Sequence, residues 1–574
     1  MKKHLIIWRG DKTKMENKDK IFEIARFILF FMTLIVVMVG TGFLFGIAIG
    51  WWSSILPLSI VIIWYALRND IEKKDKLYII AGASIIIIFT ILFSMNTYDF
   101  TWDGNAYHKQ AVGLLNDGWN PIYYISSNYN EIVKSSQLGS SGPLFWSEVY
   151  PKASWYFAAA IYSLIGNIEA GKCYTLLFAF VTFGISYNFF SKLYEKKYLS
   201  IFLALLSAFN PVVCAQFQSY YLDGIVSAVL TLLIFLFVDE SNSDNIIKYK
   251  LEVISLIIWG CNLKFSVVLF VVTYCLIFII YRSFSRKKID WKNMFLLGGT
   301  GIFSVFIIGC SPYLINLKRY GNMFYGFVGM IDDKQMAKEF GVESLSHTGR
   351  FFASLFGKMS HGSITSLKDL LKIPFTIHKG ELAMYSIVDT RVGGFGVFFS
   401  GLFVVSILII IFRLLLYKRK PYSMLFQLSM IYLVISFIEM MILPQTNQVR
   451  YIPQLYLIVI LAICEMKEIY VITGKEKCCK GIIVGIVCIA LVNIIPWISS
   501  AMYRVNDGVI TTATFKGMEK ECRTGRTYTV NYSIDDYNGL DYNLRDFNIY
   551  YQYEKDANID AEYSYTCNNM IRYK

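Results

Sequence analysis

Long apolar segments recur along this chain and limit what it can fold into. They run from Ile21 to Ser500, and each is close to the ~20 residues that an α-helix needs to cross a bilayer. Only 17% of the residues are charged, whereas a soluble domain carries about 25%. We therefore expect an all-α polytopic membrane protein with about thirteen transmembrane helices. The expected spans are 21–47, 51–67, 77–95, 172–190, 198–214, 221–238, 246–263, 265–281, 294–311, 395–417, 422–443, 451–468 and 480–500.

Basic clusters between these segments predict the orientation of the chain. The apolar patch from Ser154 to Ile165 is too short for a span. If it lies at the membrane interface, every cluster falls on the side of the basic N-terminus, as the positive-inside rule requires; if it crosses, the later clusters fall outside. We therefore expect an interfacial helix there, a cytoplasmic N-terminus, and exterior loops at about 96–171 and 312–394. The clusters are Arg68/Lys73/Lys74/Lys76, Lys192/Lys196/Lys197, Arg282/Arg286/Lys287/Lys288 and Lys418/Arg419/Lys420.

The polar C-terminal tail has a different pattern. Residues 501–574 are expected to form a small exterior β-rich domain after a transmembrane domain of residues 1–500. Alternating side chains at Arg526–Tyr532 and Phe547–Tyr551 predict short strands. Cys522 and Cys567 also lie in this tail, where an exterior location would allow a disulfide between them.

Several functions are excluded or disfavoured by the pattern of charges and loops. The net charge of +13 is explained by cytoplasmic loops and anionic lipid headgroups, so no nucleic-acid partner is expected. The cytoplasmic loops are too short for a nucleotide-binding domain, and the chain has no P-loop or strand-linked GxGxxG. No Cys or His spacing is typical of a metal site. We expect the chain to act outside, on a substrate delivered within the bilayer.

Polar motifs follow several of the apolar segments. The stretch Trp102–His108, within Tyr98–His108, gathers acids, a His and aromatic side chains directly after the third segment. The later motifs are Tyr150-Pro151-Lys152, Ser311-Pro312-Tyr313 with Asn316, Tyr320-Gly321-Asn322, Val392–Gly396 and Gln448–Pro453. In this order they resemble the GT-C class of bacterial membrane glycosyltransferases that use polyprenyl-phosphate sugars, in which protein O-mannosyltransferases and aminoarabinose transferases are the better known branches. The resemblance covers nearly the whole chain up to about residue 500.

This resemblance implies a GT-C-like fold and a function. The chain would move a sugar from a polyprenyl-phosphate donor to a cell-envelope glycan or lipid-linked acceptor, with inversion, at the exterior face of the plasma membrane. Those branches usually show an Asp-Glu pair in the first loop, whereas Gly104 follows Asp103 here; we expect no cofactor and no metal pair, with a divalent cation left open. A lipid-linked-sugar transporter or flippase and an envelope polysaccharide polymerase remain as alternatives. The transporter is disfavoured because no matching pair of interrupted helices is visible.

Within the first motif, Asp103 is the expected general base, since attack by an acceptor hydroxyl needs a carboxylate that takes its proton. The alternative is that Asp103 caps a helix beginning near Asn105. Asp99 is a secondary candidate that could instead mark the membrane edge. Tyr107 would stack on a sugar or belong to the interfacial aromatic belt, and His108 is either a substrate contact or an ordinary interfacial His.

Cations from distant segments are the expected phosphate ligands. Arg450, with Tyr451 beside it, suits bidentate phosphate binding. Lys264 lies at a bend between two spans and would join it, unless it snorkels to the interface. Lys152 would contact the lipid phosphate or anchor to headgroups. Asp223 would orient the acceptor or a cation, or cap its helix.

Overall fold

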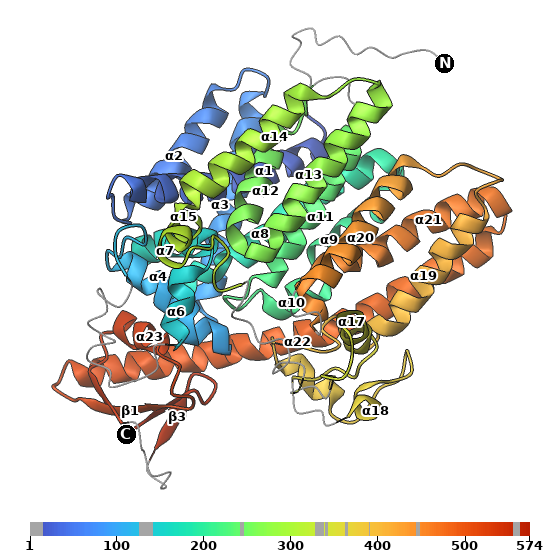
Figure 1. Cartoon of the computed structure of the whole chain (residues 1–574). Helices are drawn as coiled ribbons and strands as arrows, with labels where there is room; N and C mark the ends of the chain where they lie inside the picture. The colour runs from blue at the N-terminus through green and yellow to red at the C-terminus, as the bar shows by residue number, and fades with distance from the viewer. Residues whose placement is uncertain are drawn as a thin grey trace.

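The computed structural model of the chain is a bundle of helices with a small sheet at one end (Figure 1). It describes residues 15–125, 142–241, 246–327, 338, 342–361, 366–389, 391–443, 448–554 and 563–574. Each predicted span contains a helix. These helices are α1 (Asn17–Leu44), α2 (Trp52–Leu67), α3 (Lys73–Met95), α8 (Tyr174–Leu193), α9 (Lys197–Ala208), α11 (Asp223–Glu240), α12 (Lys250–Leu263), α13 (Phe265–Arg286), α14 (Trp291–Phe303), α19 (Phe399–Leu415), α20 (Met424–Ile442), α21 (Leu457–Thr473) and α22 (Glu476–Cys522).

Within the described residues, seven helices are long and apolar enough to cross a membrane on their own. They are α1, α3, α8 with the preceding 3-10 turn η3 (Ile168–Cys173), α13, α14 with the π-helical turn η4 (Ser304–Ile308), α20 and α22. Shorter apolar helices such as α2 and α9 pack beside them. The helical membrane fold class is therefore confirmed, whereas the number of thirteen spans stays a prediction.

The short apolar patch forms α7 (Ala153–Ile165), and its surroundings differ from the prediction. Its residues from Ala153 to Tyr162 are all buried, against α1, η3 and the short helix α4 (Lys109–Asn116). A helix of this length is about 20 Å long and cannot span the bilayer. Because it is apolar on every side, it is covered by other helices of the protein instead of lying along a membrane surface.

Prolines interrupt two of the predicted spans. Asn210 caps α10 (Pro211–Gln216) by accepting from the N–H groups of Val212 and Val213, at 3.1 and 3.2 Å, so the segment 198–214 is a helix, a break and a second helix. The segment that was expected to begin at Tyr451 starts as two 3-10 turns, η6 (Val449–Tyr451) and η7 (Pro453–Tyr456). Proline cannot donate the backbone hydrogen bond that a continuing helix needs.

The last span continues well beyond its predicted end. Helix α22 runs without a break through residue 500 to Cys522, obliquely across the end of the bundle (Figure 1). At Gly508 it passes so close to α3 that an added Cβ would lie 2.0 Å from the Asn96 carbonyl oxygen. Asn96 is the C-cap residue of α3, so α22 crosses α3 where α3 ends.

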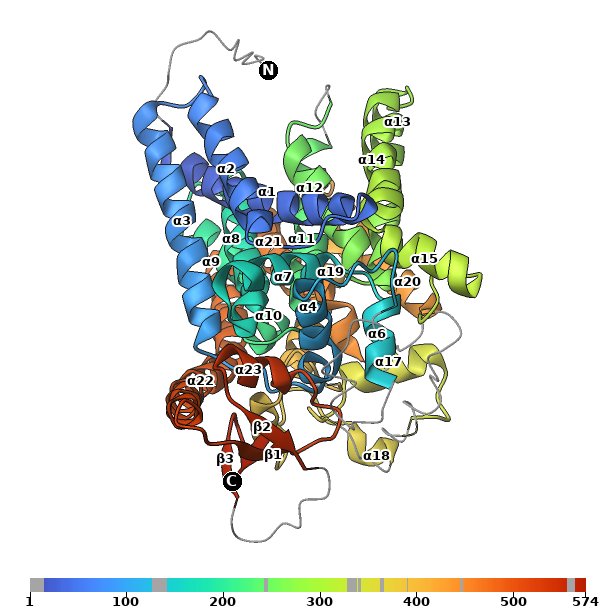
Figure 2. The same cartoon turned by 90° about the vertical axis from the view of Figure 1, so that its left-hand side faces the viewer.

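Residues 523–574, called the C-terminal cap below, carry the sheet. The strands β1 (Tyr528–Tyr532), β2 (Tyr551–Tyr553), β3 (Ser564–Thr566) and β4 (Ile571–Tyr573) follow the order β2-β1-β4-β3. β1 pairs parallel with β2 and antiparallel with β4, with Val530 opposite Tyr573. Helix α23 (Leu540–Asp546) lies between the sheet and the bundle (Figure 2).

One prediction for the cap is wrong, and the disulfide that the sequence left open is not formed. The predicted strand Phe547–Tyr551 is wrong, because the chain leaves α23 through a turn with Asn548 at φ 51° and pairs only from Tyr551. Cys522 and Cys567 are both free and buried. The Cys522 sulfur instead accepts the Tyr550 N–H at 3.3 Å.

The two segments that were predicted as exterior loops form short helices. They are the π-helical turn η1 (Gly104–His108), α4, α6 (Gly142–Val149), α7, α15 (Cys310–Tyr320), α17 (His347–Leu355), α18 (Leu367–Leu370) and the 3-10 turn η5 (Glu381–Ser386). Several of them approach one cavity, which is described next.

Candidate active site

One cavity of about 120 Å³ brings most of the predicted site residues together. It lies where η1, the α12–α13 junction, the end of α20 and η6 meet. Six predicted residues line it: Asp103, Tyr107, His108, Lys264, Arg450 and Tyr451. The remaining wall is largely aromatic and aliphatic, from Tyr150, Pro151, Tyr221, Leu222, Leu263, Phe265, Phe327, Met440, Leu443 and Ile452, with Ser266 and Gln448.

Asp103 enters this cavity from the first turn before η1. It makes no side-chain cap hydrogen bond; Thr101 caps this turn instead, because its hydroxyl oxygen accepts the Gly104 N–H at 3.1 Å. The alternative in which Asp103 serves as a helix cap is therefore wrong. Its carboxylate accepts a hydrogen bond from Tyr107 on the π-helical turn, a kind of turn that is frequent at functional sites.

The surroundings of Asp103 make it a stronger base than an ordinary aspartate. Burial and, next, the negative charge of Asp389 raise the pKa of Asp103 to about 6, against the opposing effects of Arg450, Tyr107 and Lys264. Burial and a like charge both disfavour the ionised form of a carboxyl group. A carboxylate with this pKa is still largely ionised near neutral pH and can accept a proton there.

Lys264 and Arg450 converge on one carboxylate. Lys264 lies between α12 and α13 in extended conformation and forms an ion pair with Asp223 Oδ1 at the start of α11. Arg450 Nη1 lies 3.6 Å from Asp223 Oδ2. The predicted orienting role of Asp223 toward cations thus has a geometric basis, while its predicted alternative as a helix cap does not, since Leu222 occupies the N-cap position.

Aromatic rings hold the same two cations. The guanidinium carbon of Arg450 lies 5.0 Å from the ring centroids of Tyr221 and Tyr451. Lys264 Nζ lies 5.0 Å from the Tyr451 ring. Such cation–π contacts fix the direction of a cation without neutralising it, so both charges face a common space.

His108 lines the cavity as a neutral side chain. Burial lowers its pKa to about 3, and its Nδ1 accepts a hydrogen bond from Trp155 Nε1 at 2.7 Å. With Nδ1 as the acceptor, Nε2 carries the proton. His108 can therefore donate one hydrogen bond but does not supply a charge.

Asp99 and Lys152 do not line the cavity. Asp99 is fully buried and accepts the Thr101 N–H at 2.8 Å and the Tyr220 N–H at 2.7 Å. Lys152 is 1% exposed and donates to the carbonyl oxygens of Glu148 and Tyr150 at 2.8 Å each, and burial lowers its pKa to about 7. Both residues shape the backbone behind the cavity.

Sequence reasoning missed Asp389 and included Gln448 only as the first residue of the motif Gln448–Pro453. Asp389 Oδ1 lies 2.7 Å from Arg450 Nη1, and Gln448 Oε1 accepts from Arg450 Nε at 3.0 Å. The sequence offered one weak signal, which was that Asp389 lies two residues before Arg391, just ahead of an apolar segment.

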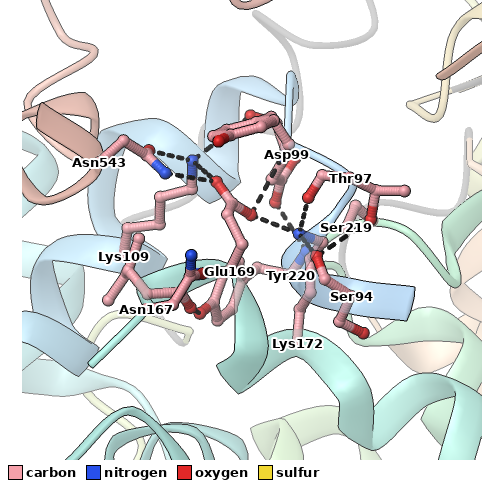
Figure 3. A network of polar contacts seen from close by, with 12 residues as sticks. Ser94, Thr97, Asp99, Lys109, Asn167, Glu169, Lys172, Ser219, Tyr220 and Asn543 are labelled. Carbon is pink, nitrogen blue, oxygen red and sulfur yellow. Dashed lines mark hydrogen bonds and ion pairs between the residues drawn. The ribbon is translucent and has the colours of Figure 1, made fainter. Parts of the chain in front are cut away.

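A buried polar network lies behind η1 (Figure 3). The Glu169 carboxylate is paired with Lys109 at 2.5 Å and also with Lys172. Asn543 from the C-terminal cap donates to Glu169 at 2.9 Å and accepts from Lys109 at 2.8 Å. All three charged side chains have no exposed surface. The network joins the cap to the helix that continues from the Asp103 turn.

The described residues contain no group of three His, Cys, Asp or Glu side chains that could hold a metal ion. Separately, the charges of Arg450 and Lys264 act on Asp103, and Asp389 lies 2.7 Å from Arg450 Nη1.

No family model matches the chain, and no curated protein matches it. Among solved structures, the chain is similar to the crystal structure of ArnT from Cupriavidus metallidurans bound to undecaprenyl phosphate. The match has 10% sequence identity and a TM-score of 0.45, and it covers 84% of this chain and 86% of that one. The function proposed below rests on the cavity and its side chains.

Proposed function

We propose that this protein is a membrane glycosyltransferase that moves a sugar from a polyprenyl-phosphate donor to a hydroxyl of a cell-envelope glycan or lipid-linked acceptor. The observation that carries the proposal is the cavity in which the carboxylate of Asp103 faces the cations Lys264 and Arg450. A base and two phosphate-binding cations around one space are the groups that transfer from a sugar phosphate needs.

The proposed reaction is a single displacement. The acceptor oxygen attacks the anomeric carbon while its proton passes to Asp103. The bond between that carbon and the phosphate oxygen breaks, and its electron pair leaves with the lipid phosphate. Arg450 and Lys264 stabilise the negative charge that develops there, and such preorganised charges act most strongly in a site that excludes water. Attack opposite to the leaving group inverts the anomeric carbon.

The apolar part of the wall supports a lipid-linked donor. Leu263, Phe265, Met440 and Leu443 lie at the ends of α12, α13 and α20 and line the same cavity as Arg450. A prenyl chain could pass between such side chains while its phosphate stays at the cations. In the proposed orientation the N-terminus is cytoplasmic, and the cavity and the C-terminal cap face the exterior side of the plasma membrane.

The test is an assay of the purified protein with polyprenyl-phosphate monosaccharides carrying a labelled sugar, in the presence of a cell-envelope fraction. We expect release of polyprenyl phosphate together with transfer of the label. Asp103→Asn should abolish transfer, whereas Asp369→Asn, at an acid of α18 outside the cavity, should leave it unchanged. Movement of a lipid-linked sugar across vesicles without transfer would support a transporter, and reaction only with diphosphate-linked saccharides would support a polymerase.

A further inference from the structure

Asp389 is a buried carboxylate that contacts three cationic or basic groups. It is 8% exposed and lies three residues after η5. Its Oδ1 is 2.7 Å from Arg450 Nη1, while its Oδ2 is 3.4 Å from Arg391 Nε and 3.6 Å from His361 Nε2. Of these partners, only Arg450 lines the cavity. Asp389 thus connects a segment without regular structure to the cation expected to meet the donor.

The formal charges around the cavity do not favour an anion as strongly as two cations would suggest. Lys264 and Arg450 are opposed by Asp223, Asp389 and Asp103. Together with Arg391, which lies 3.4 Å from Asp389 Oδ2, these groups carry no net charge when Asp103 is ionised. When it is protonated, they carry one net positive charge. The other titratable groups near Asp103 are neutral rings: Tyr107, Tyr150, Tyr221, Tyr451 and His108.

We propose that Asp389 is a positioning residue of this site: it fixes the Arg450 guanidinium toward the donor phosphate and places a negative charge beside the cation that Asp103 also faces. The inference rests on the proposed function. Asp389 and Asp223 form ion pairs with Arg450 Nη1 from two elements, and Gln448 Oε1 accepts a hydrogen bond from Arg450 Nε at 3.0 Å. The Tyr221 and Tyr451 rings lie 5.0 Å from the guanidinium carbon. The guanidinium therefore has its direction set before a ligand arrives, which reduces the ordering that binding must impose.

The negative charge of Asp389 also weakens binding of the anionic donor. A third carboxylate in a buried site repels an anionic phosphate, so Asp389 weakens donor affinity while it improves the base and orients the cation. Removing its charge should therefore separate affinity from turnover, with tighter lipid-phosphate binding and slower transfer. A residue that only stabilised the loop would weaken both.

A binding experiment tests this without knowledge of the sugar or the acceptor. The ligand is a polyprenyl methyl phosphate, which carries one negative charge throughout pH 5–8, and its Kd is measured for the full-length protein in detergent. For the unmodified protein we expect binding to tighten as pH falls through about 6, since protonation of Asp103 removes a negative charge. Asp103→Asn should bind without this pH dependence.

For Asp389→Asn we expect about tenfold tighter binding at pH 8 and a midpoint lower by about 1 pH unit, because a like charge next to Asp103 is gone. Asp389→Glu retains the charge and should restore the midpoint. Glu381→Gln is the matched control. It alters another buried acid of the same segment, paired with Lys372 at 2.5 Å away from the cavity, and should not move the midpoint.

The outcomes separate the two proposals. If the unmodified protein does not bind the ligand at any pH, the proposed lipid-phosphate site is wrong. If it binds with a midpoint near 6 but Asp389→Asn leaves midpoint and affinity unchanged, the role of Asp389 is wrong and the function stands. Should Asp389→Asn fail to fold, Asp389→Ser is measured in its place with the same expected shift, and an unchanged midpoint and affinity in that variant would again contradict the role of Asp389.

Discussion

Two aspartates four residues apart have opposite surroundings. Asp99 accepts two backbone N–H groups inside the protein, whereas Asp103 faces the cavity with Tyr107 as its hydrogen-bond donor. Both carboxyl groups are affected by burial, which raises each pKa. Only Asp103 lies beside the cations that would meet a substrate. Its ionisation should therefore control the rate.

We predict an acid limb near pH 6 for transfer. A general base must be deprotonated to act, so kcat/KM should be constant well above the pKa of Asp103, about 6, and fall about tenfold for each pH unit below it. The measurement is the pH profile of transfer from pH 4.5 to 8. Asp103→Glu keeps a carboxylate, so its pH profile should still show an acid limb, at a lower overall activity. An acid limb near pH 4 would show that another group takes the proton.

Asp99→Asn should reduce stability and leave the chemistry largely intact. An amide N–H₂ in place of one carboxylate oxygen faces a backbone donor, and a buried donor without a partner costs about 1–3 kcal/mol. We expect a lower melting temperature in detergent together with near-normal transfer for each folded molecule. The contrasting variant is Asp103→Asn, which should lose transfer without this loss of stability. The reverse pattern would assign the base to Asp99.

At the residue level, the sequence predicted site residues where a charged residue lies directly beside an apolar segment. An acid after a span, a Lys at a bend and an Arg before a Pro-containing segment predicted three residues that share the cavity, Asp103, Lys264 and Arg450. Asp389 could not be found this way, since its contact with Arg450 spans a part of the chain without periodicity. Nor could the sequence show that the Lys152 ammonium group donates its hydrogen bonds to the backbone carbonyls of Glu148 and Tyr150.

At the level of elements, the helix that carries the site is held from behind by the C-terminal cap. The Gly539 N–H donates to the Asn105 carbonyl oxygen of η1 at 2.7 Å. About two turns further along, Gly113 of α4 lies against Tyr542 of α23, and an added Cβ would stand 2.1 Å from the Tyr542 ring. The cap therefore contacts η1 and α4 on the side away from the cavity.

Gly113→Ala should undock the cap from α4. The added methyl group cannot be accommodated while the Tyr542 ring stays in place, and overpacking of a buried contact costs about 1–3 kcal/mol. We expect faster hydrogen exchange in residues 540–546 and reduced transfer. The double variant Gly113→Ala/Tyr542→Ala should recover part of the docking, and Gly298→Ala, where a Cβ meets nothing within 4 Å, is the control. Unchanged hydrogen exchange of residues 540–546 in Gly113→Ala would show that the cap accommodates the added methyl group.

The buried ion network should contribute much more to stability than an exposed pair. Lys109→Met leaves the Glu169 carboxylate with one of its two cationic partners, and loss of one partner from a buried pair costs about 3–5 kcal/mol. Lys192→Met removes a partly exposed pair with Asp239 and should cost less than about 1 kcal/mol. The free energies of unfolding in detergent test the difference. Equal effects would mean that water reaches the network.

Element positions were predictable from hydropathy, but their surroundings were not. Each predicted apolar segment contains a helix because apolar side chains must leave water in any fold. Whether a short apolar helix such as α7 meets lipid or protein depends on its neighbours. Helix α22 crosses the end of α3 at Gly508, and β2 pairs with β1. These are tertiary contacts between distant residues.

At the scale of the whole molecule, the cavity and the cap share one end of the bundle, so the orientation of the chain decides where the proposed reaction takes place. Helix α22 begins at Glu476, and exposed Cys478 lies in its first turn. At its other end, the cap carries Tyr565, which is 50% exposed. If the basic clusters are cytoplasmic, these two positions lie on opposite sides of the membrane.

Labelling of intact cells with a membrane-impermeant maleimide tests that orientation. We expect a Tyr565→Cys variant to be labelled from outside, because Tyr565 projects from β3 of the cap. Cys478 should react only after the cells are made permeable, and Cys478→Ser identifies its share of the signal. The buried thiols Cys522 and Cys567 should stay unlabelled in both conditions. Labelling of Cys478 in intact cells would place the basic loops outside and the cavity on the cytoplasmic side. In that case an exterior acceptor could not reach Asp103, and the donor would have to meet a cytoplasmic hydroxyl instead.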